Sequence, residues 1–222
     1  MIHLKSVIFD LDGTIIDSLP GLQYAVDASV RSVLSIENTI DLRPFIGLSA
    51  GKIFQSLIPS LKSRELDLLT KEYRRIYDNE GWRNSRLYTG VEDTLAFLND
   101  LQIPAFIATT KPSLPTRNIL DYLDIRRFLA DIITPDSRVP PFMSKTEALF
   151  HLSETHRLAP ENSLMIGDTN LDEEAARNCG MIFLPVTYGF GYKKEDIAIS
   201  GGFRLDQISD LIELFNSGAY NI

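Results

Sequence analysis

Short, mainly apolar segments that alternate with helical patterns are the feature that most limits how this chain can fold. They lie at residues 7–9, 104–108, 130–134, 163–168 and 181–186. The first is an unbroken apolar run, which is typical of a strand buried on both faces of a parallel sheet. Strands that alternate with helices predict an α/β fold, a doubly wound parallel sheet with helices on both faces.

The stretch from residue 16 to residue 86 has a different pattern. Helical periodicity recurs after Pro20, at residues 49–58 and at residues 63–79, and we find no strand candidate there. The chain has 222 residues, enough for one α/β domain with an inserted subdomain. We therefore predict a core domain of residues 1–15 and 87–222, with a helical cap domain of residues 16–86.

Composition restricts the partners of the chain. The formal net charge is -8, so we expect neither nucleic acid nor a membrane as partner. A small anion needs a local positive centre, either a metal ion or a few lysines. The single cysteine, Cys179, excludes an internal disulfide. We find neither a signal peptide nor an apolar run of about 18 residues, and we expect a cytoplasmic monomer or homodimer.

Polar side chains follow three of the predicted strands. Parallel strands bring such side chains together at the carboxyl edge of the sheet, where open α/β sheets bind ligands. Asp and Gly are also ordinary turn residues, so the first acidic pair alone would equally fit an acidic turn. Several carboxylates in one crevice need a cation, and oxygen ligands suit Mg²⁺. The side chains are Asp10, Asp12, Thr109, Thr110, Lys111, Asp168 and Asp172.

The order of these motifs resembles that of the haloacid dehalogenase superfamily. The resemblance rests on residues 10–14, Thr109, a following lysine and residues 167–172, and it covers essentially the whole chain. Residues 12–20, 43–47 and 186–189 further resemble phosphoglycolate phosphatase-like members with a helical cap. The resemblance implies a Mg²⁺-dependent phosphatase acting on a small phosphomonoester.

The resemblance also implies roles for individual residues. Asp10 would attack phosphorus and form an aspartyl-phosphate, and Asp12 would protonate the leaving group and then activate water. Asp10, the backbone carbonyl of Asp12 and Asp168 would bind Mg²⁺, with support from Asp172. Thr109 would bind phosphate. Haloacid dehalogenases proper lack the second aspartate, so Asp12 favours phosphoryl transfer.

Two motifs depart from the family pattern. Thr110 stands where Asn is common, which alters a phosphate or substrate contact. The lysine of the third motif usually lies in Lys-Pro-x-Pro, whereas here residues 140–145 read PPFMSK. We assign its role to Lys145, with Lys111 in reserve. Arg43 is a candidate for a substrate carboxylate, although a surface arginine is an equal alternative.

Other functions remain open from the sequence. A phosphomutase of the same fold is disfavoured by Thr14 and by Asp17-Ser18, whereas an inorganic pyrophosphatase agrees with residues 45–47. A non-catalytic binding or regulatory protein of this fold would be expected to have lost Asp10 or Asp12, and both are present. The sequence does not name the leaving group.

Overall fold

The chain divides into two compact units in the computed structural model, which describes residues 2–37, 41–197, 203–218 and 220–221. The sheet unit comprises the chain up to Asp17 and from Leu87 onward, and the helical unit comprises Ser18–Arg86. Each unit is described by itself below.

A five-stranded sheet forms the centre of the sheet unit. Its order is β6-β5-β2-β7-β8, and every neighbouring pair is parallel. The predicted α/β fold with a parallel sheet is thereby confirmed. The strands are β2 (Ser6–Phe9), β5 (Ala105–Ala108), β6 (Leu129–Ile133), β7 (Ser163–Gly167) and β8 (Ile182–Pro185).

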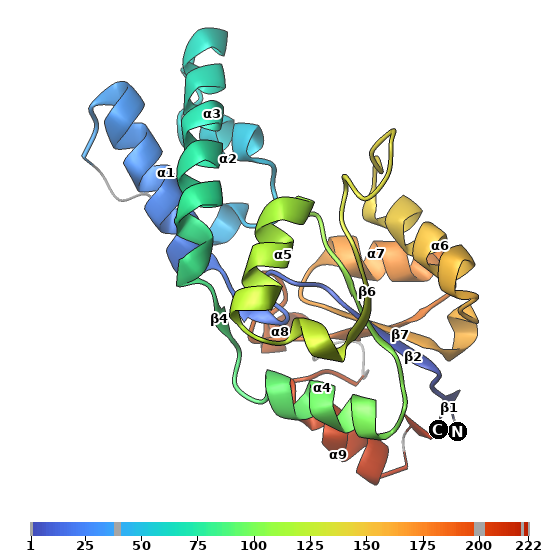
Figure 1. Cartoon of the computed structure of the whole chain (residues 1–222). Coiled ribbons are helices and arrows are strands. Elements are labelled where there is room, and N and C mark those ends of the chain that lie inside the picture. Colours follow the sequence, from blue (N-terminus) through green and yellow to red (C-terminus); the bar gives the residue numbers. More distant parts are fainter. Residues whose placement is uncertain (1, 38–40, 198–202, 219, 222) are drawn as a thin grey trace. The chain divides into compact units, whose positions relative to one another are not determined.

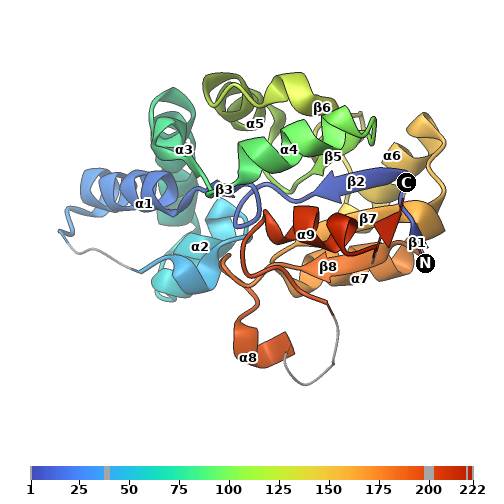
Figure 2. The same cartoon turned by 90° about the horizontal axis from the view of Figure 1, so that it is seen from below.

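Helices cover both faces of this sheet. The side chains of Ile8, Phe106 and Met165 pack in one apolar cluster with residues of α6 (Lys145–His156) and α7 (Asn170–Asn178). Figures 1 and 2 show α4 (Val91–Asp100) and α9 (Asp210–Asn216) on the opposite side, where the rings of Phe97 and Phe215 meet edge to face. Burial on both faces explains why the strand sequences lack polar alternation.

The remaining elements of the sheet unit are short or lie at its edges. Their bounds are β1 (Ile2–His3), β3 (Ile16–Asp17), α5 (Ser113–Tyr122), η3 (Arg126–Phe128), η4 (Pro160–Asn162), α8 (Lys194–Ile197) and β9 (Tyr220–Asn221). Strand β1 pairs in parallel with β9 and so brings together segments close to the two ends of the chain.

The helical unit packs its own apolar core. Leu69, Ile76 and Tyr77 of α3 are buried, and the ring of Tyr73 stacks on that of Tyr77 and meets Phe54 of α2 edge to face. The predicted apolar stripe along residues 63–79 accounts for this packing. The elements are α1 (Leu19–Leu34), η1 (Arg43–Phe45), α2 (Ala50–Leu57), α3 (Ser63–Asn79), η2 (Gly81–Asn84) and β4 (Arg86–Leu87), whose last residue belongs to the sheet unit.

The prediction that residues 16–86 hold no strand was wrong at both ends of that stretch. Residues 16 and 17 form β3, and residue 86 begins β4. A strand of two residues is too short to carry a readable apolar periodicity. In the part of the chain that the structure describes, no helix is long and apolar enough to cross a membrane.

Candidate active site

The carboxyl ends of three central strands lie level with one another. Phe9, the last residue of β2, is in register with Ile107 of β5 and with Ile166 of β7. The residues that follow therefore meet at one edge of the sheet, and the backbone N–H of Asp10 donates to Ile166 O at 2.9 Å. Asp10 is buried at this edge.

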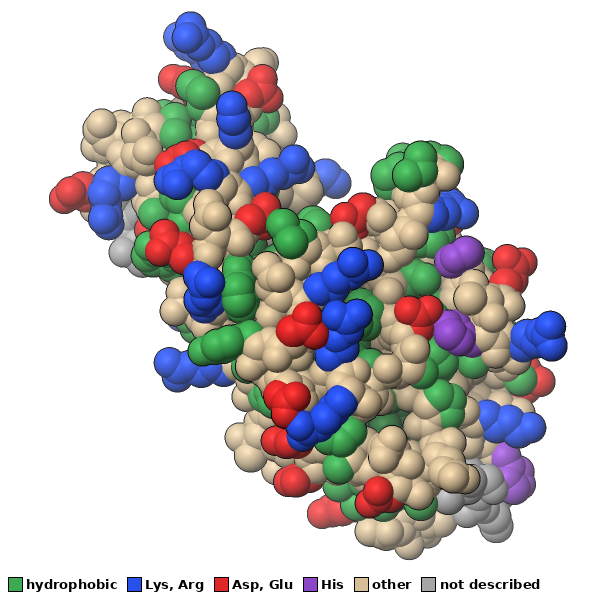
Figure 3. Space-filling model, viewed as in Figure 1, with side chains coloured by type: hydrophobic (Ala, Val, Ile, Leu, Met, Phe, Trp, Pro, Cys, Tyr) green, Lys and Arg blue, Asp and Glu red, His purple; other side chains and the backbone are tan. Residues whose placement is uncertain are grey.

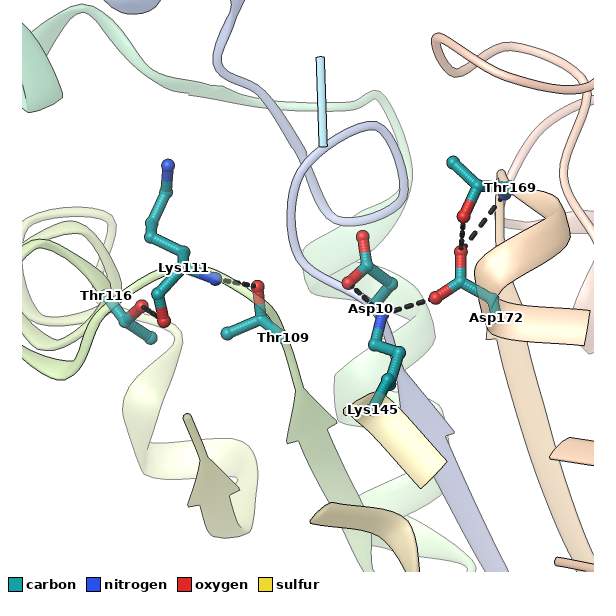
Figure 4. A network of polar contacts seen from close by, with 7 residues as sticks. All are labelled: Asp10, Thr109, Lys111, Thr116, Lys145, Thr169 and Asp172. Atoms are coloured by element: carbon teal, nitrogen blue, oxygen red, sulfur yellow. Dashed lines mark hydrogen bonds and ion pairs between the residues drawn. The ribbon is translucent and has the colours of Figure 1, made fainter. Parts of the chain in front are cut away.

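Lys145 joins Asp10 to Asp172. It is the first residue of α6, and its ammonium forms ion pairs with Oδ1 of Asp10 and Oδ1 of Asp172. Figure 4 shows the ammonium between the two carboxylates. Burial opposes the charge of Lys145, but the two carboxylates outweigh it and hold its pKa above the ordinary value. Lys145 thus compensates part of the negative charge at this edge.

A capping box fixes Asp172 in the first turn of α7. Its Oδ2 accepts the backbone N–H of Thr169 at 3.0 Å and the Thr169 hydroxyl at 2.6 Å. This cap starts α7 at Asn170. Because Oδ2 is occupied in this way, Oδ1 is the oxygen that faces Lys145.

Asp168 is fully buried and is bound on one side only. Its Oδ2 accepts the backbone N–H groups of Phe190 at 2.7 Å and Gly191 at 3.1 Å. Its Oδ1 has no hydrogen-bond partner among the residues that the structure describes. Burial raises the pKa of Asp168 to about 6, and the nearby carboxylate of Asp172 adds to the rise.

Three carboxylates at this edge could hold a metal ion. Asp10, Asp168 and Asp172 each offer one oxygen, and these oxygens lie within 4.8 Å of one another. The donors are all oxygen, which suits Mg²⁺. The buried, unpartnered Oδ1 of Asp168 fits a cation as its missing partner, because a buried polar atom without one is costly.

Asp12 forms a separate ion pair with Lys111. Strand β2 ends at Phe9, so Asp12 lies beyond the strand, ahead of the turn at Gly13, where φ is +85°. The Lys111 ammonium lies 3.0 Å from Oδ1 of Asp12, and both side chains are largely buried. Figure 4 shows Lys111 next to Thr109, and Lys145 next to Asp10. The two candidate lysines therefore contact different aspartates.

The threonines after β5 differ in exposure. Thr109 is buried, and its hydroxyl accepts the backbone N–H of Lys111 at 3.1 Å, whereas Thr110 is exposed. Arg43 lies in the helical unit, with a side chain that is 70% exposed and paired with Asp41. The structure thus brings together Asp10, Lys145, Asp168 and Asp172, pairs Asp12 with Lys111, and leaves Arg43 in the other unit.

Sequence reasoning missed three residues of this site. Thr169 was readable, because Thr169-x-x-Asp172 is a capping-box pattern at a helix start. Phe190 and Gly191 act through their backbone N–H groups, so their side chains give no signal. The nearest clue is the pair of glycines at positions 189 and 191, in the loop that follows β8.

Comparison with known proteins gives matches over nearly the whole chain. Residues 7–186 match the family model described as haloacid dehalogenase-like hydrolase. A phosphoglycolate phosphatase of Photobacterium profundum is 34% identical over 223 residues, with 95% of each chain covered. One of Vibrio cholerae is 31% identical, with 96% of this chain and 98% of the relative covered.

Solved structures share the fold. A haloacid dehalogenase-like family hydrolase from Streptococcus pneumoniae matches with a TM-score of 0.84 at 26% identity. The match covers 96% of this chain and 98% of the hydrolase. A predicted phosphoglycolate phosphatase from Haemophilus somnus has a TM-score of 0.85 at 24% identity, with 96% and 99% covered. At 24% identity, the similarity to the second structure shows a shared fold alone.

Proposed function

This chain belongs to the haloacid dehalogenase-like hydrolases and is a phosphatase, and we propose that it hydrolyses a small phosphomonoester with Mg²⁺ through an aspartyl-phosphate on Asp10. The observation that carries the proposal is the cluster at the carboxyl ends of β2 and β7. There, Asp10 lies beside two other buried carboxylates and the ammonium of Lys145. The relatives named phosphoglycolate phosphatase favour a phosphoglycolate-like substrate.

We propose that the side chains of Asp10, Asp168 and Asp172 hold the metal ion, with the backbone carbonyl of Asp12 as a further ligand. When bound, Mg²⁺ would withdraw charge from the phosphoryl oxygens. The all-oxygen donor set and the bare Oδ1 of Asp168 support this assignment.

The first step transfers the phosphoryl group to the protein. A carboxylate oxygen of Asp10 forms a bond to phosphorus while the bond from phosphorus to the substrate oxygen breaks. Asp12 gives its proton to the leaving alkoxide, so a neutral alcohol departs. Thr109 binds the phosphate, and Lys145 offsets the negative charge at Asp10 throughout.

The second step releases phosphate. Asp12 takes a proton from a water molecule, whose oxygen bonds to phosphorus while the bond to Asp10 breaks. The pair with Lys111 keeps the carboxylate of Asp12 in place between the two steps. Thr110 is exposed, and Arg43 lies in the helical unit. We keep both residues as proposed substrate contacts.

The proposed partner is a small phosphate ester, and we propose a cytoplasmic monomer or homodimer. The chain is acidic. In Figure 3, basic side chains are interspersed with acidic ones over the viewed face. Such a surface supports a small anionic substrate over a nucleic acid, which needs clustered positive charge.

The experiment that tests the reaction is phosphate release from a panel of esters. The panel contains 2-phosphoglycolate, nucleoside monophosphates, sugar phosphates and pyrophosphate, each assayed with Mg²⁺ and with chelator. We expect a phosphomonoester to be preferred, with release at background level in chelator or in Asp10→Asn. The matched control is Asp121→Asn, because Asp121 is an exposed aspartate that pairs with Arg126.

Three results would contradict the proposal. Release that persists in chelator would exclude the metal, and full activity of Asp10→Asn would exclude the nucleophile. A preference for pyrophosphate would replace the proposed substrate class. The covalent step is tested separately by quenching wild-type protein with acid during turnover of a substrate with a labelled phosphoryl group. Label retained by wild-type protein and absent from Asp10→Asn is the expected result.

A further inference from the structure

Asp168 is held by a loop that lies outside the acidic motif. The loop joins β8 to α8 and comprises residues 186–193. It donates three backbone N–H groups to Asp168: those of Phe190 and Gly191 to Oδ2, and that of Tyr192 to the main-chain carbonyl, the last at 2.7 Å. One loop therefore fixes both the side chain and the backbone of this aspartate.

The three bonds determine which oxygen of Asp168 is available. Two N–H donors occupy Oδ2, whereas Oδ1 is buried without a hydrogen-bond partner in the described part of the chain. A carboxylate bound in this way presents a single oxygen in a fixed direction. Groups that orient a metal ligand in this manner commonly set metal affinity.

Glycines make the close approach of the loop possible. A Cβ atom at Gly189 would lie 2.3 Å from the carbonyl oxygen of Gly13 and 2.6 Å from Oδ2 of Asp168. A Cβ atom at Gly191 would lie 2.2 Å from the carbonyl oxygen of Asp168. Any side chain at either position would therefore push the loop away from the aspartate.

Tyrosines anchor the loop on both sides of the glycines. The hydroxyl of Tyr188 donates to the carbonyl of Thr14 at 2.8 Å, and its ring meets that of Tyr88 edge to face. The hydroxyl of Tyr192 donates to Glu173 on α7. The loop is thus tied to the turn that follows Asp10 and Asp12 and to the helix that carries Asp172.

We infer that this loop sets the metal affinity of the site, with Gly189 and Gly191 as positioning residues that let backbone N–H groups direct Asp168 Oδ1 at the cation. The inference rests on the proposed function, since it requires a divalent cation at the carboxylates. It assigns a role to a segment that contributes no side chain to the proposed chemistry.

The test is metal binding without substrate. The full-length chain, freed of metal by chelator and dialysis, is titrated with MgCl₂ by calorimetry and with MnCl₂ by electron paramagnetic resonance. We expect Gly189→Ala and Gly191→Ala to weaken the binding of both cations by about 10- to 100-fold. Such a loss of metal affinity is typical when a group that orients a metal ligand is disturbed. The matched control is Gly51→Ala, where a Cβ atom would lie 3.9 Å from its nearest neighbour.

Thermal unfolding in chelator separates this role from a purely structural one. A structural defect lowers the unfolding temperature and leaves the Kd of the folded protein unchanged, whereas a positioning defect raises the Kd. Higher Mg²⁺ should restore phosphate release by the two variants towards the wild-type kcat. If an alanine variant fails to fold, the metal affinity of Tyr188→Phe tests the inference instead. This variant removes only the hydroxyl that ties the loop to Thr14. We expect it to weaken metal binding several-fold.

The outcomes distinguish the inference from the proposed function. A wild-type chain that bound neither cation would overturn both. Variants that bound Mg²⁺ and Mn²⁺ with wild-type Kd, beside a wild-type protein that binds them normally, would overturn the inference alone.

Discussion

Replacing Lys145 by Met removes the positive charge that two buried carboxylates share while keeping most of the side-chain volume. The Lys145 side chain is 7% exposed and contacts both Asp10 and Asp172. Removing one partner of a buried ion pair costs about 3–5 kcal/mol of folding free energy, because the remaining charge is left without compensation. For a chain of this size, about 1 kcal/mol corresponds to roughly 2–4 °C in unfolding temperature. We therefore expect Lys145→Met to unfold roughly 6–20 °C below wild type in chelator.

Mg²⁺ should reverse part of this loss, since it would neutralise the same carboxylates. A ligand at 100 times its Kd contributes about 2.7 kcal/mol, so excess Mg²⁺ should raise the unfolding temperature of the variant by roughly 5–11 °C. Far-ultraviolet circular dichroism is the suitable probe, because it follows the helices of both units, whereas the single tryptophan, Trp82, belongs to the helical unit.

The control is Lys5→Met, which removes an exposed lysine of the sheet unit. A Lys145→Met protein as stable as Lys5→Met in chelator would refute the argument that Lys145 compensates the carboxylates. If Mg²⁺ did not raise the unfolding temperature of Lys145→Met, the argument that Mg²⁺ and the Lys145 ammonium neutralise the same carboxylates would be refuted.

Three further predictions follow from single contacts. Gly13→Ala should destabilise the chain more than Gly47→Ala in urea unfolding, because both glycines have positive φ but only a Cβ at Gly13 would lie 2.3 Å from a carboxylate oxygen; equal losses would leave backbone strain as the whole cause. If the pair with Lys111 positions Asp12 as the general acid, Lys111→Met should lower kcat at least tenfold with little change in KM, and Lys111→Arg should recover part of the lost kcat. A change confined to KM would instead indicate that Lys111 contacts the phosphate. Burial raises the pKa of Cys179 to about 11, so its reaction with a disulfide reagent at pH 8 should be roughly 200-fold slower than in the unfolded chain and should rise about tenfold per pH unit up to about pH 10; a rate that levels off near pH 9 would contradict this.

The fold could be predicted from the sequence where patterns were long or uniform. The helix at residues 63–79 was predicted with the bounds of α3, because its apolar stripe extends over more than four turns. The buried strands stood out as apolar runs between helices. The two-residue strands β3 and β4 were missed, since their pairing depends on where distant segments meet and leaves no local pattern.

The candidate site could be predicted as far as side chains reveal it. Strand-end reasoning placed Asp10, Asp168 and Asp172 at one edge of the sheet, and their carboxylate oxygens lie within 4.8 Å of one another. Lys145 was assigned through the family resemblance, and its ammonium pairs with Asp10. The sequence did not distinguish the contacts of Lys145 from those of Lys111. Lys111 closely follows a predicted strand and Lys145 closely follows a loop, so either lysine could have reached the carboxylates. The backbone donors at positions 190 and 191 carry no side-chain signal, so the loop that holds Asp168 could not be read from residue types.

The central position of β2 determines when the catalytic edge can form during synthesis. Its neighbours, β5 and β7, lie about 100 and 160 residues further along the chain, and the hydroxyl of Ser6 reaches that of Ser163 across 157 positions. The helical unit is continuous from Ser18 to Arg86, so all of its residues have been translated before β5 begins. Strand β2 can therefore pair first with β5, but it lacks its second neighbour until β7 has left the ribosome. Asp10 is translated among the first residues, whereas its carboxylate neighbours Asp168 and Asp172 are translated only at the start of the last quarter of the chain.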